Sequence, residues 1–296
     1  MSTPLMMSCT VNNGLPLAPA AEPVSVPWWS FGKTVLAATA LTLVRDGLVA
    51  LDDPVEEGPF TLRQLLRHEA GLADYGELAE YHAAVARHET AWSAEEMLQR
   101  LDAARLRYAP GSGWGYSNVG YLYIARLIER TTGLALEEAL IQRALAPLDI
   151  VQVRLAKVPG DLQDMAPGYD PAWVYHGLLL GPLQQAVTFL DRLLAGQLLP
   201  DHLLSQMQTL RQLGGPIAGR PWESAGYGLG VMSGTISGGL QLCGHTGGGP
   251  GSVVAVYRAT DGEHSASCGA FLQGGMDGEV EAAVVRDLRL ALVSAQ

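Results

Sequence analysis

Ser30-Phe31-Gly32-Lys33 places a hydroxyl and an amine three residues apart, at the point where a helix is predicted to begin. Behind this stretch, apolar residues recur at the spacing of one helix face, and Gly47 supplies a stop signal. We therefore predict a helix that begins near this stretch and runs on through residues 34–45. With Ser30 in its first turn, Lys33 would lie one turn on, on the same side. The apolar positions are Val35, Ala38, Leu41 and Val44.

This serine–lysine pair has a chemical and a structural interpretation. A serine becomes a nucleophile once a base removes its proton, and a desolvated neutral lysine can do so. A serine before a helix is more often an N-cap, however, and a lysine in the first turn is more often solvated, so the pair alone favours the structural interpretation. Gly32-Lys33-Thr34 also resembles the end of a phosphate-binding loop, but that motif needs glycine where the chain has Pro27.

Composition indicates a globular protein. The 296 residues suffice for one large domain or two interlocked domains, and 48% are hydrophobic against 17% charged. The net charge of -11 argues against nucleic acid as a partner, because nucleic acid favours clusters of lysine and arginine. No apolar run has the length of a membrane helix, so a membrane partner is not predicted either.

The cysteines and the N-terminal residues indicate the cellular compartment of the protein. Cys9, Cys243 and Cys268 are too few and too widely spaced for a disulfide scaffold, which favours reduced thiols. The first nine residues lack the basic region and the apolar run of a secretory signal peptide. Together these features predict a cytoplasmic protein.

A second cluster, Tyr116-Ser117-Asn118, lies between a Pro/Gly-rich loop and another helical pattern. A phenol at this place can pass protons, and an asparagine amide can hydrogen-bond both a lysine and a substrate carbonyl. Taken alone, packing of Tyr116 and helix capping by Asn118 account for the same residues.

A third cluster, Cys-Gly-His-Thr-Gly-Gly-Gly-Pro-Gly over residues 243–251, follows an alternating apolar segment, so that residues 245–247 are predicted to end or to form an exposed strand. Glycine lets a substrate approach the backbone, and a free N–H there suits an oxyanion hole. The alternative is a Gly-rich turn with a surface histidine. A metal is not predicted, because neither His245 nor His68 has a partner at ligand spacing. The Gly-x-Ser-x-Gly element of α/β-hydrolases is not in the sequence.

In this order along the chain, Ser-x-x-Lys, Tyr-x-Asn and His-Thr-Gly resemble the serine β-lactamase and penicillin-binding-protein-like superfamily. The class C-like branch is the most similar; it includes family VIII carboxylesterases, D-aminopeptidases and D-Ala-D-Ala carboxypeptidases. The segments around the motifs resemble the same family, so that the resemblance covers most of residues 30–258. These segments are residues 47–55, 61–72, 116–133 and 227–230.

The resemblance implies an acyl-enzyme mechanism. Ser30 would attack an ester or amide carbonyl, and water would then hydrolyse the acyl-enzyme. Lys33 and Tyr116 would share the role of base, in a division that the sequence leaves open. Asn118 would position Lys33 and the substrate.

The resemblance also assigns the third cluster to substrate binding. The backbone N–H groups of Ser30 and Gly248 would form an oxyanion hole beside Gly247, where each donor is typically worth about 3 kcal/mol of barrier. His245 stands where penicillin-recognising members usually carry lysine, and a histidine is mostly neutral at pH 7. We therefore expect esters, or amides without an obligatory carboxylate, rather than β-lactams.

The resemblance, together with the pattern of helices and strands, implies a β-lactamase/transpeptidase-like fold of the α/β class, α+β type, with an antiparallel sheet flanked by helices. Residues 1–55 and 182–296 would form the sheet domain, residues 56–181 an inserted and mainly helical subdomain, and the active site would lie in the cleft between them. The predicted strands and closing helix in the last third are residues 228–233, 240–244, 252–258, 268–272 and 278–292.

For function, we predict hydrolysis of a small carboxylic ester without cofactor or metal, so that the partner is a small-molecule ester or amide. The alternatives are a D-amino-acid peptidase or amidase, a weak β-lactamase, and an acyltransferase. A non-catalytic binding protein of the same fold is the least favoured, because all four of Ser30, Lys33, Tyr116 and Asn118 are present.

Overall fold

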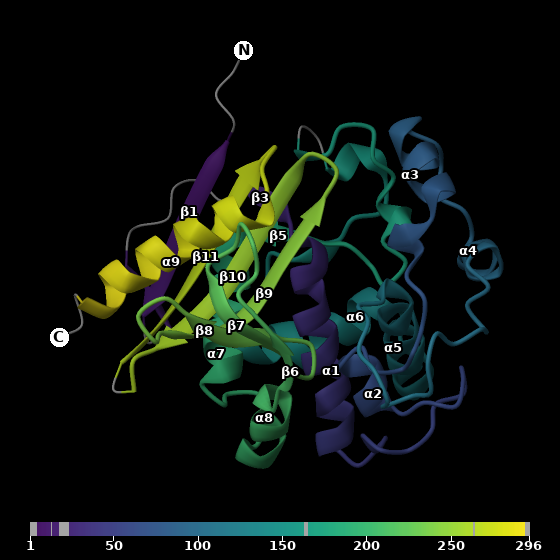
Figure 1. The fold of residues 1–296 in the computed structure, drawn as a ribbon, viewed down its shortest axis with the longest axis horizontal. Coiled ribbons are helices and arrows are strands. Elements are labelled where there is room, and N and C mark those ends of the chain that lie inside the picture. Colours follow the sequence, from purple (N-terminus) through teal and green to yellow (C-terminus); the bar gives the residue numbers. More distant parts are fainter. Residues whose placement is uncertain (1–4, 13, 18–23, 163–164, 263, 294–296) are drawn as a thin grey trace.

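The computed structural model describes residues 5–12, 14–17, 24–162, 165–262 and 264–293 of the chain. Its centre is an antiparallel sheet with the spatial order β2-β1-β11-β10-β9-β8-β7-β6 (Figure 1). Both ends of the chain contribute to this sheet, because β1 pairs with β11. The strands are β1 (Met6–Asn12), β2 (Leu15–Pro16), β6 (Arg211–Gly214), β7 (Trp222–Tyr227), β8 (Met232–Ile236), β9 (Gln241–Gly249), β10 (Ser252–Thr260) and β11 (Ser265–Gln273).

Helices cover both faces of this sheet and gather beside it. Figure 1 shows α9 across one face and α7 behind the other, with α1 to α6 grouped to the side. The helices are α1 (Gly32–Arg45), α2 (Leu62–Leu66), α3 (Ala79–Ala86), α4 (Ala94–Arg100), α5 (Asn118–Thr132), α6 (Leu136–Leu140), α7 (Leu183–Leu194), α8 (Asp201–Gln208) and α9 (Asp277–Val293). The predicted fold class is confirmed: helices flank an antiparallel sheet.

A small second sheet ties the N-terminal segment to the middle of the chain. Its order is β3-β5-β4, with β3 (Ser25–Pro27), β5 (Leu179–Pro182) and β4 (Arg154–Leu155). Since β4 belongs to the segment predicted as the helical subdomain and β3 to the predicted sheet domain, this sheet joins the two. The division at residues 56 and 181 stays a prediction.

Short turns of other helix types are η1 (Trp29–Phe31), η2 (Tyr75–Glu77), the π-helical η3 (Ile141–Leu145), η4 (Ala146–Leu148), η5 (Pro159–Asp161) and η7 (Pro171–Trp173).

Helix α1 lies at the centre of the molecule, not at its surface. The apolar pattern predicts one buried face, whereas every residue from Gly32 to Leu43 is buried. Burial on all sides is possible because the polar side chains find partners nearby: the Thr39 and Thr42 hydroxyls donate to backbone oxygens of the helix at 2.9 and 2.7 Å. The helix ends as predicted, with Gly47 at a positive φ of 71°.

The central strand β10 shows how the two sides of the sheet are filled. Val254 and Val256 belong to the core that contains α1 and α7, while Ala255 and Tyr257 belong to the core beneath α9. This is the period-two alternation of a strand, with both faces buried. The strand therefore reads as a continuous apolar run in the sequence.

The strand predicted over residues 228–233 is wrong in its boundaries. Residues 228–231 form the turn between β7 and β8, in which the Gly228 N–H bonds to the Val231 oxygen at 2.8 Å. Gly230 has a φ of 78° and lies so close to α1 that an added Cβ would come within 2.3 Å of the Ala37 Cβ. A close approach between distant segments thus fixes this turn, and the local pattern does not contain that information.

Three further observations concern the protein as a whole. In the part of the chain that the structure describes, no helix is both long and apolar enough to span a bilayer. Cys9, Cys243 and Cys268 are free thiols. Among the described residues, no group of three or more His, Cys, Asp or Glu side chains is arranged to hold a metal ion.

Candidate active site

Ser30 lies in η1, directly before α1, and its side chain faces other polar groups instead of the helix backbone. Its Oγ accepts a hydrogen bond from the Tyr116 hydroxyl at 2.8 Å and lies 3.3 Å from Lys33 Nζ. The N-cap position of α1 is occupied by Phe31, without a side-chain capping bond. The structural interpretation of Ser30 as an N-cap is therefore wrong.

Lys33 is fully buried, so it is not a solvated lysine. Its Nζ donates to Asn118 Oδ1 at 2.6 Å and lies 3.2 Å from His176 Nε2. Burial lowers the pKa of Lys33 to about 7, an effect that the Asp74 carboxylate opposes. A substantial fraction of this side chain is consequently a neutral amine near pH 7, which is the form that can accept a proton.

Asn118 is held in one orientation by Asp74. The Asp74 Oδ1 accepts from the Asn118 backbone N–H at 2.8 Å and from Nδ2 at 3.1 Å. With its amide nitrogen engaged in this way, Asn118 turns its Oδ1 toward Lys33. Burial raises the pKa of the Asp74 carboxyl, while the bonds from Asn118 and the charge of Lys33 oppose that rise.

The loop before α5 fixes Tyr116 against His68. The two rings are 4.4 Å apart, and the Ser117 N–H donates to His68 Nδ1 at 3.1 Å. Burial holds the pKa of His68 well below its usual value, so the ring is neutral and can accept this bond. The helix cap is Ser117 and not Asn118, since Ser117 Oγ accepts from the Gly120 N–H at 3.4 Å.

Tyr116 itself is a protonated phenol near neutral pH. Burial raises its pKa above the usual value of a tyrosine, and the hydrogen bond with Ser30 only partly offsets this. A phenol in this state donates to Ser30 Oγ and can supply a proton, whereas Lys33 is the group whose pKa suits a base.

Strand β9 carries the third cluster along η1, and its glycines make the close approach possible. A Cβ added at Gly247 would lie 2.4 Å from the Ser30 nitrogen, and one at Gly249 would overlap the Trp29 ring at the same distance. Trp29 has a positive φ of 40°, an uncommon conformation for a large residue, directly before Ser30. The glycines predicted to admit a substrate also admit the backbone of η1.

We expect Gly247→Ala to displace β9 from η1, because a methyl group at this position meets the Ser30 and Phe31 nitrogens. Turnover of an activated ester should fall by about tenfold or more, and overpacking should cost about 1–3 kcal/mol of stability in urea unfolding. Gly160→Ala is a matched control, because an added Cβ at Gly160 has no atom within 4 Å. Equal turnover in the two variants would count against a close β9–η1 contact.

His245 is buried, so it is not the surface histidine of the alternative interpretation. Its Nδ1 lies 2.6 Å from the Thr246 carbonyl oxygen, which can only accept, and its Nε2 lies 2.9 Å from the Tyr227 hydroxyl. Burial, with help from the Lys33 charge, lowers the pKa of His245 to about 3. The ring is therefore neutral at pH 7 and presents no cation to a substrate carboxylate.

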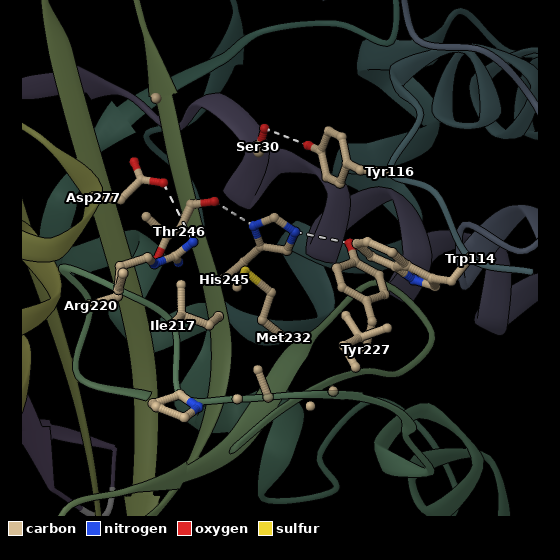
Figure 2. A pocket seen from close by; sticks show the side chains of 18 residues that line it. Ser30, Trp114, Tyr116, Ile217, Arg220, Tyr227, Met232, His245, Thr246 and Asp277 are labelled. Carbon is tan, nitrogen blue, oxygen red and sulfur yellow. Dashed lines mark hydrogen bonds and ion pairs between the residues drawn. The ribbon is translucent and has the colours of Figure 1, made fainter. Parts of the chain in front are cut away.

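Two pockets meet at Ser30 and Gly248. The larger, of about 640 Å³, is lined by Tyr116 and His245 together with Arg220 and Asp277 (Figure 2). The smaller, of about 100 Å³, lies on the other side, where Asn118 and His176 line it. Gly248 thus lies beside Ser30 at the junction, as an oxyanion donor would need to.

The structure brings all seven predicted site residues together, and it adds residues that the sequence analysis missed. Asp74 and His176 complete the surroundings of Lys33 and Asn118, and Arg220 and Asp277 line the larger pocket. The motifs carry no signal for them, because they come from parts of the chain that lie outside the three clusters. Of the aromatic residues near the motifs, Trp28 and Phe31 pack in the core, while Trp29 and Trp114 line the pockets.

Curated relatives and solved structures point to the same group of proteins. A D-aminopeptidase from Cereibacter sphaeroides is 26% identical over 241 residues, which are 74% of this chain and 44% of that protein. A lovastatin esterase from Penicillium rubens is 31% identical over 124 residues, 41% of this chain and 30% of that protein. The chain thus spans less than half the length of these curated relatives.

A D-stereospecific amidohydrolase from Streptomyces sp. is similar in structure, with a TM-score of 0.72 and 27% identity, covering 89% of this chain and 88% of that one. The sequence model of the beta-lactamase family matches residues 24–293, which is nearly the whole chain. The resemblance carried by the three motifs is therefore confirmed, and the chain belongs to the beta-lactamase family.

Proposed function

We propose that the protein is a serine hydrolase that transfers the acyl group of a D-amino-acid amide or peptide to Ser30 and then to water. The observation that carries this proposal is the position of Ser30 Oγ, 2.8 Å from the Tyr116 hydroxyl and 3.3 Å from a lysine whose pKa burial lowers to about 7. A serine between a base of this pKa and a protonated phenol has both partners that acyl transfer requires.

In the acylation step, neutral Lys33 accepts the proton of Ser30 as Oγ bonds to the substrate carbonyl carbon. The backbone N–H groups of Ser30 and Gly248 stabilise the resulting oxyanion. Tyr116 gives its proton to the leaving nitrogen as the carbon–nitrogen bond breaks, and regains one from Lys33. One proton is thereby moved, in net, from Ser30 to the leaving amine. In deacylation, Lys33 accepts a proton from the water that attacks the acyl carbon, and Ser30 Oγ regains a proton as its bond to that carbon breaks, which releases the acid.

The substrate class rests on the relatives and on His245. The D-aminopeptidase and the D-stereospecific amidohydrolase, at 26% and 27% identity, support a D-amino-acid amide. His245 is neutral and buried, and so offers no fixed positive charge to the carboxylate of a β-lactam. We therefore expect β-lactams to be hydrolysed more slowly than amides.

A small carboxylic ester is the second candidate. The similarity to the lovastatin esterase supports it, at 31% identity over part of the chain. The same neutral His245 favours it, since an ester needs no carboxylate recognition. Cleavage of an ester also depends less on proton donation by Tyr116, because an alkoxide leaves more readily than an amine anion.

The proposal is tested by labelling and by substrate comparison. A fluorophosphonate probe should label the protein at Ser30, as mapped by mass spectrometry of the labelled peptide. The p-nitroanilide of D-alanine should be turned over at least about tenfold faster than its L-isomer. The comparison substrates are p-nitrophenyl acetate as the ester and a chromogenic cephalosporin as the β-lactam. Absence of labelling would contradict a serine hydrolase, and ester turnover without amide turnover would favour the second candidate. Transfer of the acyl group to an added amine would identify the protein as an acyltransferase.

A further inference from the structure

The position of Tyr116 distinguishes the two pockets chemically. The group that protonates a leaving atom must lie within one hydrogen bond of it. Tyr116 lines the larger pocket, whereas Asn118 and His176 line the smaller one. With Tyr116 as the proton donor of the proposed reaction, the leaving group lies in the larger pocket and the acyl group in the smaller.

The two pockets differ in the size of group they admit. About 640 Å³ lies within the roughly 300–1,000 Å³ typical of ligand pockets. About 100 Å³ is less than the roughly 150 Å³ of an apolar cavity that holds benzene. The small pocket is walled by Trp29, Tyr75, Tyr81 and Tyr169, whose rings leave room for a small side chain such as that of alanine.

The charged groups in the wall of the larger pocket and directly behind it carry a surplus negative charge. Among its described lining residues, Arg220 and Asp277 are the charged ones, and Figure 2 shows them side by side. Arg220 is committed to Glu281, which is 1% exposed and accepts two hydrogen bonds from the guanidinium, one of them at 2.8 Å. One guanidinium thus faces two carboxylates, which leaves a net charge of one negative unit.

Asp277 is the less tightly engaged of these two carboxylates. It forms an ion pair with the Arg220 guanidinium at 3.6 Å, which is longer than a hydrogen bond, and 46% of its side chain is exposed. It also lies beside the reacting centre, since a Cβ added at Gly248 would be 3.6 Å from Asp277 Oδ1. An exposed carboxylate of this kind attracts a cation and repels an anion.

We infer that Asp277 binds a cationic group on the leaving portion of the substrate, so that preferred substrates join a small D-acyl group, such as D-alanyl, to a basic amine or amino acid. This inference rests on the proposed function and narrows its substrate class. It assigns Asp277 to specificity and leaves the chemistry with Ser30, Lys33 and Tyr116.

The test compares three dipeptide amides, D-alanyl-lysine, D-alanyl-norleucine and D-alanyl-glutamate amide, at mildly alkaline pH. We expect kcat/KM for the lysine compound to exceed that for norleucine by about fivefold, the value of a partly exposed ion pair, with glutamate below both. In Asp277→Asn the lysine and norleucine compounds should be cleaved with equal kcat/KM. Replacing D-alanyl by D-phenylalanyl should lower kcat/KM by about tenfold or more, because the larger ring exceeds the small pocket.

Asp201→Asn is the matched control, because Asp201 begins α8 as Asp277 begins α9 and lines neither pocket at Ser30. It should keep the preference for lysine. A wild-type enzyme that treats lysine and norleucine alike, or a preference that survives in Asp277→Asn, would overturn the inference. A preference for glutamate would assign recognition to Arg220 instead, and equal turnover of the D-phenylalanyl compound would overturn the assignment of the pockets.

Failure of the proposed function gives a different result. If none of the dipeptide amides is cleaved while p-nitrophenyl acetate is, the D-amino-acid amide function is contradicted. The cation site is then measured by inhibition of ester turnover with lysine amide and norleucine amide. Lysine amide should inhibit more strongly in the wild type and equally in Asp277→Asn; equal inhibition in the wild type would overturn the cation site by itself.

Discussion

Hydrolysis by the Ser30→Ala variant is expected to fall by about 10⁶-fold, to the background of the assay, for amides and esters alike. Ser30 Oγ is the atom on which the Tyr116 hydroxyl and Lys33 Nζ converge, so its removal leaves the base and the proton donor without a nucleophile. Labelling by the fluorophosphonate probe should vanish as well. Both are measured on the purified variant, with p-nitrophenyl acetate as the reporter.

Two observations separate loss of chemistry from loss of fold. Ser30→Ala removes one partly exposed oxygen, so its thermal unfolding midpoint should match the wild type. Ser112→Ala, at an exposed serine in the loop before Tyr116, should keep full activity and labelling. Residual turnover or labelling in Ser30→Ala above background would mean that another residue is the nucleophile.

The Lys33→Met variant is expected to lose about 10³-fold in kcat/KM, within the range for a general base. Burial lowers the pKa of Lys33 to about 7, so kcat/KM of the wild type should rise with pH as the ammonium loses its proton, and level off above that value. Methionine keeps the length and the apolar stem but cannot take a proton, so the rising limb should disappear. The measurement is a pH profile of kcat/KM for the ester.

Lys157→Met provides the control for Lys33→Met, because Lys157 is an exposed lysine paired with Glu137 and lines neither pocket at Ser30. It should leave the profile unchanged. Lys33→Met should not lower the unfolding midpoint, since a lowered pKa means that the buried ammonium destabilises the fold. If kcat/KM of the wild type does not rise with pH near 7, or if it rises in the same way in Lys33→Met, Lys33 is not the base.

Much of the candidate site could be predicted because its parts are local. Ser30 and Lys33 lie on one helical turn, and their relation follows from spacing alone. The order of three short motifs then identifies the family, which the match over residues 24–293 confirms. The fold class follows from the same order together with the periodicity of the helices and strands.

What escaped prediction depends on contacts between distant segments. Asp74 acts on Asn118 across 44 residues, and His176 reaches Lys33 across 143. The turn over residues 228–231 was mistaken for a strand because its cause is a close contact of Gly230 with α1. No short pattern in the chain records such pairings.

The sequence by itself determined the candidate reacting groups: a hydroxyl and an amine one helical turn apart, with a phenol, an amide and a glycine-rich strand to follow. Only the tertiary structure decided what those groups can do. A lysine accepts a proton near pH 7 only when it is removed from water, and Lys33 is buried by packing of α1 on all sides. The surplus charge of Asp277 likewise depends on Glu281 engaging Arg220 from 61 residues away. Desolvation and charge balance are properties of the assembled protein, because they depend on every segment that surrounds a group.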